Sequence, residues 1–329
     1  MMQCSNCGAC VLAGDKFCEE CGTSLTANGC EKCGAGIEAI DDEGFCNNCG
    51  FRKEMRERDR LEVTIDLHLA GISDRGLKHN RNEDFLALKQ LNNAQTNILV
   101  VCDGVSSSDK SDVAAQIAAE SACLALATAW EKGENPESAM KSAFATALQS
   151  VCNIPYVNSI NSEHPSTTIV AALVQDHTAT IGWLGDSRAY WISDNNSQQL
   201  TKDDSWLREV VAAGEMTEVE ARQSPHAHAI TRWLGADATE NVDPSIVHFT
   251  IPGSGYLLLC TDGLWNYAPE ASHLAKIIQQ TSNTDAIALQ FFGHPTADVG
   301  AAIAISHSLV EFACNSGGHD NITVAILCL

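Results

Sequence analysis

Asn97-Ile98-Leu99-Val100-Val101-Cys102-Asp103-Gly104 is an apolar run that predicts a buried strand and ends in a carboxylate. Two other stretches repeat this combination: residues 256–261 lead into Asp262-Gly263, and Asp320-Asn321 opens an apolar run over residues 322–327. A fourth acidic motif is Asn82-Glu83-Asp84. One Asp-Gly alone predicts a turn, but carboxylates that converge at sheet edges repel one another unless a cation neutralises them. The pattern therefore predicts a site for Mg²⁺ or Mn²⁺, which prefer oxygen ligands.

The remainder of residues 63–329 interleaves strand-like and helix-like patterns. Alternation and apolar runs predict strands over residues 61–69, 168–174 and 178–191. Helical spacing and caps predict helices over residues 113–130, from Asn135-Pro136 to about Val151, from the capping box at residues 217–220, and over residues 297–313. This mixture predicts an α+β domain built of layers.

Cysteines mark a separate segment at residues 1–50, which hold nine of the 15 in the chain. Eight of them form two repeats of paired Cys-x2-Cys knuckles: Cys4, Cys7, Cys18 and Cys21, then Cys30, Cys33, Cys46 and Cys49. Two knuckles supply four thiolates, the ligand set of a structural Zn²⁺. Disulfides and a redox dithiol are the alternatives. The recurrence of paired knuckles without a secretory signal favours two structural zinc ions, which would provide most of the folding energy of the segment.

Charge patterning describes the rest of the chain. Residues 51–62 are rich in charged side chains and predict a linker or a short solvated helix. The formal net charge of −22 argues against a partner with a phosphate backbone, so nucleic acid is not expected. No apolar run reaches the roughly 18 residues of a membrane span, and no signal peptide opens the chain. We therefore expect a cytoplasmic protein without a membrane partner.

From about Ala70 to Leu329 the chain resembles the metal-dependent serine/threonine protein phosphatases of the type 2C family, in their bacterial form. Besides the acidic motifs, the resemblance is carried in order by Gly71-Ile72-Ser73-Asp74-Arg75-Gly76, Leu184-Gly185-Asp186-Ser187-Arg188-Ala189-Tyr190, Cys260-Thr261-Asp262-Gly263-Leu264-Trp265 and Gly318-His319-Asp320-Asn321-Ile322-Thr323. It implies a β-sandwich flanked by helices on both faces, in α-β-β-α layers. The cysteine-rich segment resembles a double zinc ribbon.

The resemblance also implies a reaction, the hydrolysis of phosphoserine and phosphothreonine by a metal-activated water. It implies that Asp103 bridges two Mn²⁺ or Mg²⁺ ions, that the Gly104 carbonyl binds one of them, and that Asp262 and Asp320 bind the other. Glu83 and Asp84 are implied to orient metal-bound waters. A third ion is an open alternative, with Asn266 and Glu163 as candidate contacts, whereas Asp186 is expected to fix a turn.

One position departs from the family pattern where the substrate phosphate is bound. His79 stands where relatives carry an arginine, with Lys78 and Arg81 beside it. Arginine is always charged and binds in a bidentate manner, whereas histidine is charged only in part near neutral pH. We expect His79 to bind the phosphate, and Arg81 or Lys78 is the alternative.

Two functions follow from these expectations. The first is a phosphatase that acts on phosphorylated proteins in a serine/threonine kinase pathway. The second is a phosphoprotein-binding scaffold or sensor of low activity, recruited by an unidentified protein partner of the zinc ribbons. The complete acidic set favours the first function, while His79 leaves room for the second.

Overall fold

The computed structural model divides into two compact units, Met1–Arg58 and Asp59–Leu329. It describes residues 2–3, 10–11, 30, 32–33, 35–36, 39, 46–50, 57–91, 95–156, 163–194, 196–236, 238, 243–292 and 300–329, with the backbone alone at residues 2–3, 10–11, 57 and 282–292. The first unit contains a short antiparallel pair, β1 (Met2–Gln3) and β2 (Cys10–Val11). The 3-10 helix η2 (Glu57–Asp59) spans the boundary between the units in the sequence and leads into β3 (Arg60–Thr64). Strand β3 therefore begins inside the range assigned to the linker.

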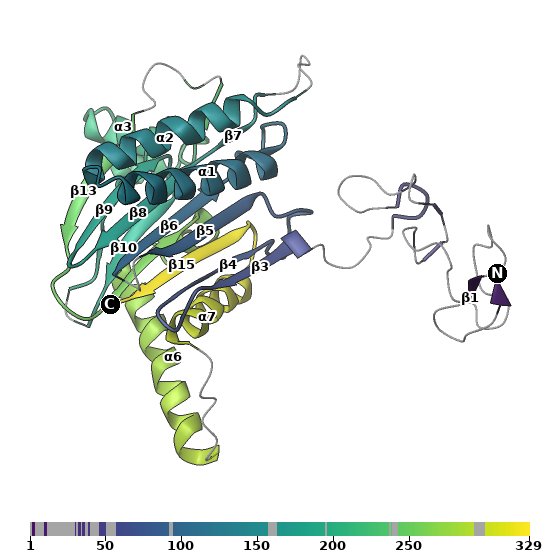
Figure 1. The fold of residues 1–329 in the computed structure, drawn as a ribbon. Helices are drawn as coiled ribbons and strands as arrows, with labels where there is room; N and C mark the ends of the chain where they lie inside the picture. Colours follow the sequence, from purple (N-terminus) through teal and green to yellow (C-terminus); the bar gives the residue numbers. More distant parts are fainter. Residues whose placement is uncertain are drawn as a thin grey trace. The chain divides into compact units, whose positions relative to one another are not determined.

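Two antiparallel sheets form a sandwich in the second unit (Figure 1). The six-stranded sheet contains, in spatial order, β11 (Gln198–Gln199), β10 (Arg188–Ile192), β14 (Tyr256–Cys260), β15 (Ile322–Cys328), β4 (Leu69–Asp74) and β3. The five-stranded sheet contains β13 (Ser245–Thr250), β9 (Thr178–Leu184), β8 (Ile169–Gln175), β6 (Thr96–Asp103) and β5 (Asp84–Leu91). A small sheet pairs β7 (Ser166–Thr167) with β12 (Leu234–Gly235).

The strand β6 shows how the sandwich is packed. Leu99 and Val101 face the core between the two sheets, together with Trp191 of β10. Ile98 and Val100 face the opposite way, into a second core beneath helices. Successive side chains of a strand point to opposite faces, and both faces of β6 are buried. This explains why the strand is a continuous apolar run rather than an alternating one.

Helices cover both outer faces of the sandwich, as Figure 1 shows. Helices α1 (Ser111–Glu131) and α2 (Pro136–Cys152) lie on the five-stranded sheet, and α6 (Ala271–Phe292) and α7 (Ala301–Asn315) lie on the six-stranded sheet. Three short helices are α3 (Trp206–Ala212), α4 (Glu218–Arg222) and α5 (Asp262–Trp265). The predicted helix-flanked sandwich is confirmed.

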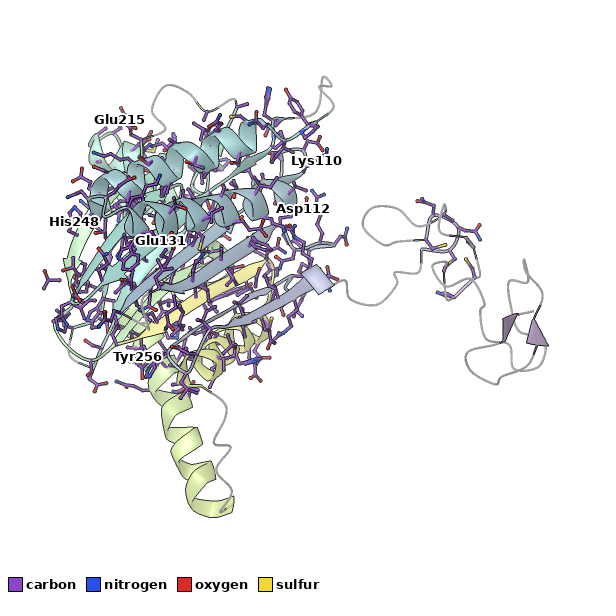
Figure 2. All side chains as sticks on the ribbon, viewed as in Figure 1. Lys110, Asp112, Glu131, Glu215, His248 and Tyr256 are labelled. Carbon is purple, nitrogen blue, oxygen red and sulfur yellow. The ribbon has the colours of Figure 1, made fainter. Side chains whose placement is uncertain are left out.

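Helix α1 differs from one expectation. By length and composition it could cross a membrane, although no such run was expected from the sequence. Half of the tested window is buried inside the domain, against the sheet and α2, which is typical of a core helix. Figure 2 labels Lys110 and Asp112 at the beginning of this helix and Glu131 at its end.

Two of the predicted strands are wrong as single elements, because a turn divides each of them. The carboxylate of Asp66 accepts hydrogen bonds from the backbone nitrogens of His68 (2.8 Å) and Leu69 (2.9 Å), which closes the hairpin between β3 and β4. At Gly185 the backbone has φ +102° and the chain leaves β9 for β10 in the other sheet. The predicted caps at Asn135 and Thr217 are confirmed.

Candidate catalytic metal site

The four acidic motifs meet at one end of the sandwich. Strands β5 and β6 pair so that Asp84 lies opposite Asp103. In the other sheet, Asp262 follows the end of β14 and Asp320 precedes the start of its partner β15. The Thr261 hydroxyl donates to Asp84 Oδ2 at 2.8 Å and links the two sheets at this point. Antiparallel pairing therefore gathers carboxylates that are far apart in the sequence.

Burial and, after it, mutual repulsion determine the electrostatics of this acidic cluster, which we define as Asp84, Asp103, Asp262, Asp320 and Asp186. Burial, followed by the charge of Asp320, raises the pKa of Asp84 to about 7. Burial and the charges of Asp84 and Asp262 raise the pKa of Asp103 well above its usual range. The pKa of Asp262 is raised by burial and by Asp186 and Asp320. These carboxylates can be anions together when a cation neutralises them.

Three observations fit the cluster to hard divalent ions. Asp84 Oδ1 is buried and has no hydrogen-bond partner in the described part of the chain. A Cβ at Gly104 would lie 2.5 Å from the Ser111 backbone oxygen and 2.7 Å from that of Glu83, so only glycine fits beside Asp103. The available donors are carboxylate and carbonyl oxygens, which Mg²⁺ and Mn²⁺ prefer.

Glu83 is a buried carboxylate next to the acidic cluster, and its surroundings favour its ionised form. It is 5% exposed. Its Oε1 accepts from Arg81 Nη2 at 2.8 Å and from the Ser111 hydroxyl, and its Oε2 accepts from the Ser106 hydroxyl at 2.9 Å. Burial alone would raise the pKa of Glu83, but contacts with His79 and Ser111 and the charge of Arg81 lower it to about 2. The guanidinium of Arg81 is thus directed to Glu83.

The imidazole of His79 reaches the acidic cluster. Its Nε2 lies 3.2 Å from Asp320 Oδ1, and its Nδ1 lies 3.7 Å from Glu83 Oε2. The contact with Glu83 and the charge of Asp320 raise the pKa of His79 in spite of its partial burial. The side chain is 29% exposed, so it can meet a ligand from solvent. Lys78, the other cation considered from the sequence, is exposed.

The sequence prediction gave no role to Asn321 and gave Asp186 a role in a turn alone. Asn321 accepts from the Glu83 backbone nitrogen at 2.8 Å and donates to the Arg81 backbone oxygen at 3.0 Å, so it orders the loop that carries His79. Its position after Asp320 was the available signal. Asp186 lies in the expected turn but also joins the cluster: burial and the charge of Asp203 raise its pKa to about 7.

The contacts proposed for a third ion have protein partners. Asn266 Nδ2 donates to Asp262 Oδ2 at 3.1 Å, so it supports that carboxylate. The Ser107 hydroxyl donates to Glu163 Oε2 at 2.5 Å. The carboxylate of Asp186, beside Asp262 in the acidic cluster, is the additional oxygen donor that the sequence did not predict.

A cavity of about 370 Å³ adjoins the acidic cluster at Asp186. Arg188 lines this cavity. Its Nε and Nη2 donate to the Asp203 carboxylate at 2.9 and 2.6 Å, and its guanidinium lies 3.8 Å from the centre of the Trp265 ring. Helices α3 and α4 form its outer wall, with Arg208 and Arg222 among the lining residues.

The first unit holds a different set of ligands. The sulfurs of Cys30 and Cys49, and those of Cys33 and Cys46, lie 3.5 Å apart, and all four lie within 4.8 Å of one another. These distances exclude a disulfide, whose sulfurs lie about 2 Å apart, and approach the roughly 3.8 Å edge of a tetrahedral zinc–thiolate site. No other such group of three or more ligand atoms occurs among the residues the structure describes. The carboxylate oxygens of the acidic cluster therefore lie farther apart than the four sulfurs do.

One sulfur of this thiolate cluster is also held as an anion. A backbone hydrogen bond at Ala35, followed by one from Asn48 Nδ2 at 3.6 Å, lowers the pKa of Cys33 to about 6. The other four predicted ligands, Cys4, Cys7, Cys18 and Cys21, lie outside the described residues.

A helix-flanked sandwich with carboxylates gathered at one end defines a class of hydrolase that depends on divalent metal ions. Residues 76–289 match the model of the family described as Protein phosphatase 2C, and residues 4–50 match that of the Double zinc ribbon. The chain belongs to the protein phosphatase 2C family. The resemblance inferred from the motifs is thereby confirmed.

The chain matches the following three relatives over nearly their whole length. The serine/threonine phosphatase stp of Listeria innocua is 28% identical over 268 residues, which are 79% of this chain and 95% of the relative. The crystal structure of Stp1 from Staphylococcus aureus matches with a TM-score of 0.63 at 23% identity, covering 84% of this chain and 99% of that one. The phosphatase PstP/Ppp of Mycobacterium tuberculosis matches with a TM-score of 0.59 at 25% identity, covering 82% and 99%.

Proposed function

We propose that this chain is a protein serine/threonine phosphatase that hydrolyses phosphoserine and phosphothreonine with Mn²⁺ or Mg²⁺. The observation that carries the proposal is the convergence of Asp84, Asp103, Asp262 and Asp320 at one end of the sandwich. Membership of the protein phosphatase 2C family supports it, as does similarity to a serine/threonine phosphatase over nearly that protein's full length.

Each residue of the site has a proposed task. Asp103 and the Gly104 carbonyl would hold one ion, Asp103 with Asp262 and Asp320 a second, and Asp186 offers a carboxylate for a third. When bound, such ions activate a water molecule and neutralise phosphate charge. Asp84, whose Oδ1 has no partner in the described part of the chain, would accept a hydrogen bond from that water. Glu83, held as an anion by Arg81 and Ser111, would orient a second water.

His79 is proposed to bind the substrate phosphate. Its raised pKa favours the imidazolium, which donates charge-assisted hydrogen bonds to an anion. The alternative, Arg81, already donates to the Glu83 carboxylate at 2.8 and 3.1 Å. Moving the Arg81 guanidinium to a phosphate would take both hydrogen bonds and a full positive charge from a buried carboxylate, which would keep, among the described residues, only the Ser106 and Ser111 hydroxyls and the His79 imidazole. This cost favours His79.

The N-terminal segment is proposed to hold two structural zinc ions, one in each Cys4 set of residues 1–50. The thiolate cluster of Cys30, Cys33, Cys46 and Cys49 supports the second of them. We further propose that this module recruits a protein partner, and that the phosphatase acts in the cytoplasm opposite a serine/threonine kinase.

One assay tests the function. The purified chain is incubated with p-nitrophenyl phosphate and with a phosphothreonine peptide, each in Mn²⁺, Mg²⁺ or EDTA. We expect phosphate release from both substrates with Mn²⁺ or Mg²⁺ and none in EDTA. Binding of the phosphopeptide without turnover under all conditions would favour the scaffold instead.

A further inference from the structure

The loop between β4 and β5 carries His79 and is fixed at its ends. Asn321 Nδ2 donates to the backbone oxygens of Arg75 (2.8 Å) and Arg81 (3.0 Å), which lie at opposite ends of the loop. Gly76 has φ +71°, and a Cβ there would lie 2.1 Å from the backbone oxygen of Asp320. These contacts hold the two ends and not the tip, where His79 lies.

The side chain of Arg75 supplies a contact at the tip. Its Nη1 donates to the backbone oxygen of His79, and its Nε lies 3.7 Å from Asp59 Oδ2. Asp59 is 3% exposed, and its backbone oxygen accepts from the Arg75 backbone nitrogen at 2.8 Å. The contact of Arg75 Nε with Asp59 is an ion pair without a hydrogen bond. It draws the rigid, planar guanidinium toward Asp59 while Nη1 reaches the backbone oxygen of His79.

We propose that Arg75 is a positioning residue for His79, an inference that rests on the proposed role of His79 in binding the phosphate. Arg75 acts through the backbone oxygen of His79. With that oxygen held, the imidazole stays at the acidic cluster, 3.2 Å from Asp320. Asp59, the first residue of the catalytic unit, thereby takes part in ordering the phosphate-binding loop.

A double-mutant cycle in the full chain tests this, with p-nitrophenyl phosphate and Mn²⁺ as substrate and metal. We expect Arg75→Ala to raise KM about three- to tenfold and to change kcat less than about twofold, because the loop moves while the metal ligands stay. In a His79→Ala background, the same substitution should change KM less than about twofold, since no imidazole remains to be positioned. A role in stability alone would not produce this dependence on His79.

Two further variants complete the experiment. Lys141→Ala removes an exposed lysine that pairs with Glu137 on α2, and it controls for the loss of a surface cation. Arg75→Lys keeps a positive charge beside Asp59 without the fork. It should raise KM by less than Arg75→Ala, again only when His79 is present, and it replaces Arg75→Ala if that variant does not fold.

The possible results separate this inference from the proposed function. An unchanged KM in Arg75→Ala, with a raised KM in His79→Ala, would overturn the positioning role and leave the phosphatase assignment intact. Effects of the two substitutions that multiply in the double variant would overturn it as well. A wild-type chain without metal-dependent turnover would overturn the proposed function, and this inference with it.

Discussion

The thiolate cluster and the acidic cluster are two proposed metal sites of opposite construction. In the described part of the first unit, only Cys30 and Cys46 are buried apolar side chains, and both are proposed ligands. The acidic cluster lies at the end of a sandwich with three apolar cores. If zinc binds as proposed, it would provide most of the folding energy of the first unit, whereas the second unit holds repelling carboxylates together at an energetic cost. The ligands of the thiolate cluster would stabilise the fold of the first unit through the metal, whereas the carboxylates of the acidic cluster destabilise the metal-free fold of the second.

The largest expected effect concerns the thiolate cluster. Cys30→Ser or Cys49→Ser should lower the zinc content by one ion per chain and expose residues 30–50 to protease, because structural zinc contributes about 10 kcal/mol to such folds. Activity on p-nitrophenyl phosphate should stay within about twofold of wild type, since the catalytic unit has its own cores. Elemental analysis, limited proteolysis and the phosphatase assay measure the three quantities.

Cys152→Ser, at an exposed cysteine of α2 outside the cluster, is the matched control and should keep the full zinc content. An unchanged zinc content in the Cys30 and Cys49 variants, or disulfides among these cysteines, would show that the thiolate cluster is not a zinc site.

The next effect concerns the acidic cluster. Asp103→Asn or Asp262→Asn should lower kcat by about a thousandfold, because each removes a carboxylate from the proposed ligand set. In EDTA, however, each variant should melt at the same temperature as wild type or higher, since one repelling charge is gone. Activity assays and thermal melts separate the loss of the site from the loss of the fold.

Glu131→Gln, at the opposite end of α1 from Asp112 (Figure 2), removes a carboxylate away from the cluster. It should change neither kcat nor the melting temperature in EDTA. Near-normal turnover in both aspartate variants with normal metal loading would show that the ligands are elsewhere.

Metal and pH should act together on stability. The pKa of Asp84 is raised to about 7, so the metal-free folded state binds protons that the unfolded state has released. Its stability therefore falls as pH rises from about 4 to 7 and beyond. Mn²⁺ binds the deprotonated carboxylates, so it should stabilise more at pH 8 than at pH 6. At a hundredfold excess over Kd we expect a rise in Tm of about 5–10 °C at pH 8.

Thermal melts at both pH values, with Mn²⁺ or EDTA, measure this effect. Asp84→Asn removes one of the titrating groups and should narrow the difference between pH 6 and pH 8 in EDTA. Equal melting temperatures with Mn²⁺ and EDTA at both pH values would contradict a cation site formed by repelling carboxylates.

The smallest expected effect is at His79. His79→Ala should raise KM about three- to tenfold with the metals still bound, because one donor to the phosphate is lost. The imidazolium binds a phosphate better than the neutral imidazole, so kcat/KM should fall as pH rises through the pKa that His79 has with the metal ions bound. His79→Arg should retain or raise kcat/KM and flatten this dependence. If Arg81→Ala raises KM and His79→Ala does not, the phosphate binds at Arg81.

The sequence predicted what depends on neighbours along the chain. The strand that ends in Asp103 could be predicted because an apolar run stops at a carboxylate. The turn at Asp66 was not predicted, because the alternation of apolar and polar residues continues across it. The turn at Gly185-Asp186 was expected, but the strand predicted over residues 178–191 still ran through it. Asn321 was missed for another reason: it binds the Arg81 backbone oxygen 240 residues away. Its place after Asp320 marks it as part of a motif, but a contact over this separation leaves no spacing that would reveal its hydrogen-bond partner.

The contact between Arg75 and Asp59 also bears on how the catalytic unit should be cut from the zinc module. A fragment that begins at residue 63, the boundary read from the sequence, would lack Asp59 and the first half of β3. It would lose the pairing of Arg60 with Asp74 and of Leu61 with Ser73, as well as the anchor of Arg75. Weak phosphate binding by such a fragment would then be attributed wrongly to the loss of the zinc ribbons, although its cause would be the loss of Asp59 and part of β3 from the catalytic unit. A cut before residue 57 keeps the two effects apart.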